Sequence, residues 1–377
     1  MKPEGFCAPE FEPVREAFLA NFADGDEVGA SVAVTQNGAQ VVDLWAGDAV
    51  KGGAPWRRDT IVNVYSTTKT MASTCLLMLA DRRAIDFDAP VARYWPEFAR
   101  NGKEGVLVRH VMSHSAGLSG FDPPLESVEE LYNWDGIVRR LAAQKPWWTP
   151  GDGSGYHALT QGYLQGEIVR RVTGKSIGAF FRDEIAGPLG ADFHIGLAPE
   201  HDARVAELVP PPVGPAATPG DPASIAVRTM KSASIDGSEP RTPAWRRAEI
   251  PAGGGIGNAR SVARVHSALA CGGAVDGVRL LSEAGVRRAL EEQTNGTDRV
   301  LNTPVRFGMG FGLTGPSMPL SPNPNVLFWG GWGGSIAIID LDARVSIAYV
   351  MNRMAPDMLG DLRGAMIVLA TYKSLAG

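Results

Sequence analysis

The stretch GASVAVTQNGAQVVDLWAG (residues 29–47) decides the fold class. Apolar and polar residues alternate on both sides of Asn37-Gly38, and this dipeptide between two alternating runs is a strong signal for a β-hairpin. Near the other end of the chain, NVLFWGG (325–331) and SIAIIDLDARVSIAYVMN (335–352) predict three more neighbouring strands. Strands from both ends therefore predict one antiparallel sheet that the two ends of the chain complete.

Helical patterns flank and interrupt this sheet. Apolar residues at helical spacing predict one helix over 9–24 and a closing helix over 358–375. Further helices are expected over 66–83, 126–144, 159–173, 176–186 and from about Asn258 or Ser261 to Gly272. The Pro-rich stretch 209–224 is interpreted as a long surface connection.

These patterns together predict an α/β (α+β) fold. An antiparallel sheet would be flanked by N- and C-terminal helices and would carry a mostly helical inserted domain. We place residues 1–65 and 240–377 in the sheet domain and residues 66–239 in the helical domain. We expect the active site at the interface between the two.

Composition excludes several classes of function. The 377 residues contain 36 Lys and Arg against 41 Asp and Glu, so no basic surface for nucleic acid is expected. The three cysteines lie far apart and predict neither a disulfide framework nor a zinc site. Neither an N-terminal signal core nor a long uncharged apolar segment is evident, which predicts a cytoplasmic protein without a membrane partner.

The stretch VYSTTKTMAS (64–73) raises a chemical question, because a lysine stands at the head of an apolar run. In a helix Ser66 and Lys69 share one face, and a lysine buried there would lose its proton and serve as a base. Ser66 would then be an activated nucleophile, with helix N-terminal amides aimed at a developing oxyanion. The alternative is a capping serine followed by a surface lysine.

Two further stretches favour the catalytic interpretation. PGDGSGYHALTQGYLQGEIVRRVTG (150–174) places Tyr156 just before a helix, and FWGGWGGSIAIID (328–340) places a Gly-rich turn at the start of a strand. With Ser66 and Lys69, these stretches resemble the three active-site elements of the serine β-lactamase and penicillin-binding protein superfamily. HSAGL (114–118) and GGGIGNARSVARV (253–265) resemble one branch of it, the β-lactamase-like carboxylesterases (esterase family VIII). The resemblance spans nearly the whole chain and implies a β-lactamase/transpeptidase-like fold.

The resemblance also implies a role for each matching residue. Ser66 would be acylated, Lys69 would take its proton, and Tyr156 would relay protons to the leaving group and help to activate water. Trp329-Gly330-Gly331 takes the place of a Lys-Thr-Gly motif that binds substrate. The backbone N–H of Trp332 would complete an oxyanion hole with the N–H of Ser66.

Two departures from the superfamily pattern bear on the substrate. The lysine that helps to bind a β-lactam carboxylate is Trp329 here, which would supply a flat apolar wall. The asparagine of Tyr-x-Asn is Ala158. Both changes favour a neutral ester, so the chain is expected to be a serine carboxylesterase for short-chain, neutral esters.

Other interpretations stay open from the sequence. The same site could transfer acyl groups to alcohols or hydrolyse β-lactams weakly, and an inactive ligand-binding relative is an alternative of another class. His157, next to Tyr156, could line the substrate pocket or fill space. No metal or organic cofactor is called for, and the oligomeric state is left open.

Two motifs are interpreted as structural. Gly174-Lys175-Ser176-Ile177-Gly178 satisfies the Gly-x-Ser-x-Gly pattern, but a helix precedes it where a nucleophile elbow needs a strand. His110 and His114 lie four residues apart without the glutamate of a His-Glu-x-x-His zinc site, and loop histidines bonded to backbone are the better interpretation.

Overall fold

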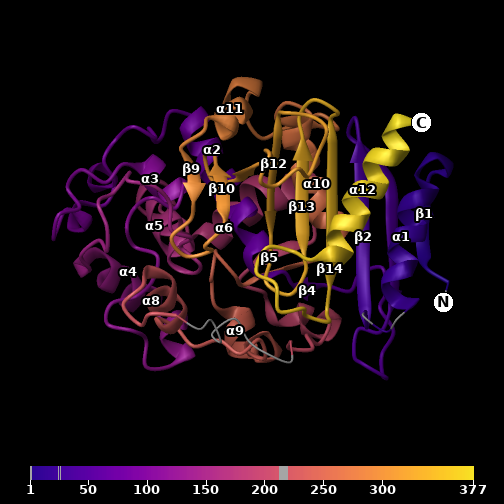
Figure 1. Ribbon diagram of the computed structural model, residues 1–377, viewed down its shortest axis with the longest axis horizontal. Helices are drawn as coiled ribbons and strands as arrows, with labels where there is room; N and C mark the ends of the chain where they lie inside the picture. The colour runs from indigo at the N-terminus through magenta and orange to yellow at the C-terminus, as the bar shows by residue number, and fades with distance from the viewer. Residues whose placement is uncertain (1, 24, 26, 212–219) are drawn as a thin grey trace.

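A nine-stranded antiparallel sheet forms one side of the molecule (Figure 1). The computed structural model describes residues 2–23, 25, 27–211 and 220–377. The strand order is β1-β3-β2-β14-β13-β12-β11-β10-β9. The strands are β1 (Glu4–Cys7), β2 (Gly29–Gln36), β3 (Ala39–Gly47), β9 (Thr294–Thr297), β10 (Pro304–Phe307), β11 (Gly312–Leu313), β12 (Val326–Gly330), β13 (Ile336–Asp340) and β14 (Val345–Met351).

The two ends of the chain meet in the middle of this sheet. Strand β2 pairs with β14 in a register that runs from Ala30 opposite Met351 to Gln36 opposite Val345. The hairpin between β2 and β3 turns at Asn37-Gly38, whose φ angles of 51° and 87° are the left-handed values that a tight hairpin requires. The predicted antiparallel sheet built from both ends is confirmed.

Helices cover both faces of the sheet. The first helix α1 (Glu12–Ala23) packs beside the last, α12 (Leu362–Ala376), on the front face in Figure 1, and α10 (Ala259–Ala270) lies behind it. Helix α12 begins four residues later than predicted, because Asp361 is its N-cap and accepts a hydrogen bond from the Arg363 N–H.

The helical part lies beside the sheet, centred on α2 (Thr68–Asp81) and α5 (Thr160–Thr173). The predicted helix over 126–144 is wrong in its first half, where a 3₁₀ segment (Val128–Tyr132) stands. The Asn133 side chain then accepts from the Gly136 N–H and starts α4. The remaining helices are α3 (Val108–Met112), α4 (Trp134–Ala143), α6 (Ile177–Phe181), α7 (Gly187–Leu189), α8 (Ile225–Lys231), α9 (Pro243–Arg247) and α11 (Glu283–Arg287).

A small three-stranded sheet next to α2 pairs segments that are distant in the sequence. Its order is β4 (Val62–Asn63), β6 (Gly255–Gly257) and β5 (Phe193–Ile195), and the hairpin β7 (Ala274–Val275) and β8 (Val278–Arg279) stands apart. The proposed domain boundaries stay a prediction, and half of the Pro-rich connection lies outside the described residues. Among the helices that the structure describes, none has the length and apolar content needed to cross a bilayer.

Candidate active site

Ser66 lies in a tight 3₁₀ turn (Tyr65–Thr67) that leads directly into α2. The residue before it, Tyr65, has a φ of 42°, a left-handed conformation that is uncommon for a residue with a side chain. The Thr68 hydroxyl donates to the Tyr65 carbonyl over 2.5 Å, and the Tyr65 ring packs 5.0 Å from that of Trp332. These contacts hold the strained turn and place Ser66 on the wall of a pocket.

Lys69 reaches Ser66 from the first turn of α2. Its Nζ lies 3.0 Å from Ser66 Oγ, 2.7 Å from the Ala158 carbonyl and 2.8 Å from the Ala252 carbonyl. Only 2% of Lys69 is exposed, and burial lowers its pKa well below the usual range. A neutral amine has two N–H groups and one lone pair, which match two carbonyl acceptors and one hydroxyl donor. The predicted surface-lysine alternative does not apply.

Tyr156 is the second side chain that reaches Ser66 Oγ. Its hydroxyl donates to Ser66 Oγ over 2.6 Å and accepts a hydrogen bond from the Trp329 indole N–H over 3.2 Å. Burial raises the pKa of the Tyr156 phenol, so the group stays protonated at neutral pH. Asp298 fixes the Tyr156 backbone by accepting from its N–H over 3.0 Å.

The turn after β12 places Trp332 on the lining of the same pocket as Ser66. The neighbouring Gly331 has no room for a side chain, because a Cβ there would lie 2.2 Å from the Val64 carbonyl oxygen. Ser335 Oγ donates to that carbonyl over 2.9 Å and joins the turn to the segment before Ser66. Within the described part of the chain, the N–H groups of Ser66 and Trp332 have no hydrogen-bond acceptor. Two donors are thus available to a ligand.

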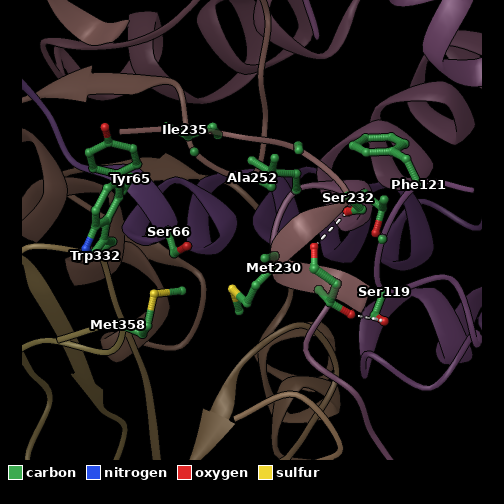
Figure 2. A pocket seen from close by; sticks show the side chains of 17 residues that line it. Tyr65, Ser66, Ser119, Phe121, Met230, Ser232, Ile235, Ala252, Trp332 and Met358 are labelled. Atoms are coloured by element: carbon green, nitrogen blue, oxygen red, sulfur yellow. Dashed lines mark hydrogen bonds between the residues drawn. The ribbon is translucent and has the colours of Figure 1, made fainter. Parts of the chain in front are cut away.

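The pocket beside Ser66 is small and largely apolar. It has a volume of about 80 Å³. Figure 2 shows Ser66, Tyr65, Trp332 and Met358 on one side of it, with Ser119, Ser232 and Phe121 on the other. Every described residue that lines it is uncharged. This environment suits a small neutral group.

Trp329 does not form the substrate wall that the sequence suggested. Only 2% of it is exposed, and it is absent from the described lining of the pocket. Its indole packs behind the catalytic candidates, 5.2 Å from the Tyr156 ring and 5.2 Å from the Phe307 ring. Gly330 and Gly331 likewise serve close backbone packing, since a Cβ on Gly330 would lie 2.4 Å from the Leu359 main chain.

His157 is also removed from the pocket. It is fully buried, its Nδ1 lies 2.6 Å from the Gly155 carbonyl, and its Nε2 accepts from the Leu118 N–H over 3.0 Å. Burial lowers the pKa of His157 to about 3, so the imidazole is neutral. The structure therefore gives His157 a bridging position between two loops and supplies no support for substrate contact.

The Gly-x-Ser-x-Gly segment and the His110 and His114 pair have the structural roles that were expected. Gly174, with a φ of 73°, ends α5, and the Ser176 side chain caps α6. The Nδ1 atoms of His110 and His114 each accept a backbone N–H, from Leu107 and His157.

Some contributions to the site were missed from the sequence. The main-chain carbonyls of Ala158 and Ala252 accept hydrogen bonds from Lys69, and their role could not be predicted because every residue has such a carbonyl. Asp298 carries a weak signal, since it also accepts from the N–H groups of Val300 and Leu301 as a turn-forming aspartate does. The Trp329 donor could have been expected only from knowing that Tyr156 lies beside it.

Comparison with known proteins finds relatives that match nearly the whole chain. The beta-lactamase family model matches residues 15–371. An esterase/beta-lactamase, LipL, of Mycobacterium tuberculosis is 36% identical over 96% of this chain and 85% of its own length. A solved family VIII carboxylesterase is 41% identical, with a TM-score of 0.92 over 99% of this chain and 100% of its own.

A penicillin-binding protein homologue from Caulobacter crescentus is 39% identical, with a TM-score of 0.92 over 99% of this chain and all of that one. Sequence and structure are thus similar over almost the full length of these relatives. The chain belongs to the beta-lactamase family.

Proposed function

We propose that this protein is a serine carboxylesterase that hydrolyses short-chain, neutral esters through an acyl-enzyme on Ser66. One observation carries the proposal: Ser66 Oγ lies within hydrogen-bond distance of both Lys69 Nζ and Tyr156 OH. Two relatives named as an esterase/beta-lactamase and a family VIII carboxylesterase support the reaction class.

In the acylation step, Ser66 Oγ attacks the ester carbonyl carbon and its proton passes to the neutral amine of Lys69. The carbonyl oxygen becomes an oxyanion and accepts from the N–H groups of Ser66 and Trp332. Because these donors are fixed in main chain, they need little reorganisation as charge develops.

Collapse of the tetrahedral intermediate breaks the bond between carbonyl carbon and alcohol oxygen. The departing alkoxide takes a proton from the Tyr156 phenol, and the Lys69 ammonium returns a proton to the resulting phenolate, so the proton first taken from Ser66 ends on the alcohol. Water then attacks the acyl-enzyme, gives up a proton through the same groups and releases the carboxylic acid. The Tyr156 phenol can act as donor because its raised pKa keeps it protonated.

The pocket supports the proposed substrate class. Its volume of about 80 Å³ and its uncharged lining favour a small apolar acyl or alcohol group. A carboxylate-bearing β-lactam would enter without a lining cation to compensate its lost hydration. Acyl transfer to an alcohol shares the first half-reaction, and partitioning of the acyl-enzyme between water and added alcohol separates transfer from hydrolysis.

The test is turnover of p-nitrophenyl butyrate by Ser66→Ala. We expect kcat to fall roughly a thousandfold or more, since loss of a nucleophile removes the covalent route. Ser73→Ala is the matched control, because Ser73 is a buried serine in α2, the helix that follows Ser66. Wild-type turnover by Ser66→Ala would reject the proposal, as would a wild-type protein that hydrolyses no ester in a graded panel while binding esters.

A further inference from the structure

An arginine from the last helix reaches the turn that carries the Trp332 amide. Arg363 Nη2 donates to the Gly333 carbonyl over 2.7 Å, two peptide units beyond the Trp332 N–H. Gly333 and Gly334 have φ angles of 101° and 129°, so this part of the turn has a conformation open mainly to glycine. A glycine pair costs conformational entropy to order, and an external bond that holds it compensates this cost.

The same guanidinium is anchored on its other edges. Its Nη1 donates to Glu27 over 2.7 Å and to the Arg353 carbonyl over 2.9 Å, and its Nε donates to Asp361 over 3.0 Å. Only 11% of the Arg363 side chain is exposed, and the Glu27 side chain is fully buried. Tyr349 donates its hydroxyl hydrogen to Glu27 as well. Among the residues that the structure describes, the acidic groups that pair with Arg363 are Glu27 and Asp361.

The place of Arg363 in its helix is unfavourable by itself. It stands in the first turn of α12, where the helix dipole disfavours a cation. A buried ion pair also adds little net stability, because desolvation offsets the attraction. Stability alone therefore does not explain an arginine at this position. Its hydrogen bond to the Gly333 carbonyl, in the turn after β12, gives a better explanation.

We propose that Arg363 is a positioning residue for the oxyanion hole, and this proposal rests on the esterase function proposed above. Its planar fork spans the Gly333 carbonyl on one edge and Glu27 on another, and so fixes the turn relative to α12 and the segment that precedes β2. A lysine retains the charge but has a single nitrogen and cannot span these acceptors.

The test compares Arg363→Lys with Arg260→Lys. Arg260 is matched, since it donates to the Asp43 carboxylate over 2.7 Å and to the Arg58 carbonyl over 3.1 Å, with no contact to the turn. Two readouts are used: kinetics with p-nitrophenyl butyrate and its thiono analogue, and amide hydrogen exchange of peptides covering 328–336.

For Arg363→Lys we expect kcat on the oxo ester to fall roughly tenfold with KM nearly unchanged, below the roughly hundredfold cost of losing an oxyanion donor outright. The ratio of oxo to thiono activity should fall by a similar factor, because sulfur gains less from the donors. Exchange in 328–336 should accelerate. Arg260→Lys should change none of these.

Wild-type ratio and exchange in Arg363→Lys would overturn the positioning role. If that variant does not fold, the pair Glu27→Leu with Arg363→Met replaces the buried Glu27–Arg363 ion pair by apolar groups, leaves Asp361 as the N-cap of α12 and carries the same expectations. A wild-type protein without esterase activity would defeat the proposed function alone, since the exchange experiment still decides whether Arg363 holds the turn.

Discussion

The indole N–H of Trp329 donates a hydrogen bond to the phenolic oxygen of Tyr156 over 3.2 Å. The phenolic oxygen then has its own hydrogen left for Ser66 Oγ, 2.6 Å away. Three groups therefore form a directed series from indole to phenol to serine. A residue that resembles a substrate contact in the sequence instead sets the direction in which Tyr156 donates.

Trp329→Phe tests this relationship. The ring packing is largely kept and the donor is lost, so we expect kcat to fall roughly tenfold, the kinetic equivalent of one hydrogen bond of about 1–1.5 kcal/mol. Steady-state kinetics on p-nitrophenyl butyrate measures it. Trp245→Phe is the control, because Trp245 is buried and donates to Asn63 over 3.0 Å outside the proposed reacting groups. An unchanged kcat in Trp329→Phe would refute the orienting role.

Tyr156→Phe removes the proposed proton donor. We expect kcat to fall roughly 10²- to 10³-fold, in the range for loss of a general acid–base group. Tyr163→Phe provides the comparison, since Tyr163 is also buried on the helical side and donates to the Leu131 carbonyl over 2.7 Å. Equal activity of the two variants would contradict the role of Tyr156.

The pH dependence follows from Lys69. Burial lowers its pKa, so the active neutral amine forms at a lower pH than in an exposed lysine, whose pKa is about 10.4. Activity (kcat/KM) should be low while Lys69 is protonated, rise through its lowered pKa and then level off. Lys69→Met should abolish this rise.

Lys103→Met is the control for Lys69→Met. Lys103 is a second buried lysine that donates to main-chain carbonyls, those of Arg100, Ala142 and Gln144. It lies outside the described pocket lining. The pH–rate profile of Lys103→Met should match that of the wild type. A displaced profile in this variant would show that the rise of kcat/KM with pH reflects protein stability and not the titration of Lys69.

Selectivity for neutral esters is expected to depend on the uncharged pocket. Met358→Lys places a cation on its lining and should raise the ratio of activity on a succinate monoester to that on a butyrate ester several-fold, through charge pairing of about 1 kcal/mol. Leu362→Lys, on the exposed surface of α12, should leave the ratio unchanged. A ratio unaffected by Met358→Lys would show that lining charge does not govern selectivity.

The sheet could be predicted because its signals are local. The turn at Asn37-Gly38 and the alternation around it depend on neighbours in sequence, and the pairing of β2 with β14 follows from strands at both ends. The helix over 126–144 was predicted too long, because the helical spacing of apolar residues extends upstream of Trp134, where α4 begins. The Asn133 side chain supplies a cap that breaks the pattern.

The site was predictable as far as residue type determines chemistry. Ser66 and Lys69 are recognisable at helical spacing, and the resemblance supplied Tyr156. Whether Trp329 meets Tyr156 depends on which face of β12 packs against Tyr156. The hydrogen bonds that position Lys69 go to main-chain carbonyls, which any residue could provide. Such relationships exist only once distant segments have packed together.

The account is tested most directly by rapidly quenching wild-type protein during turnover of p-nitrophenyl butyrate and locating the acyl group by peptide mass spectrometry. The account predicts a butyryl group on the peptide that contains Ser66, and none in Ser66→Ala. An acyl group on any other residue of a fully active enzyme would contradict it.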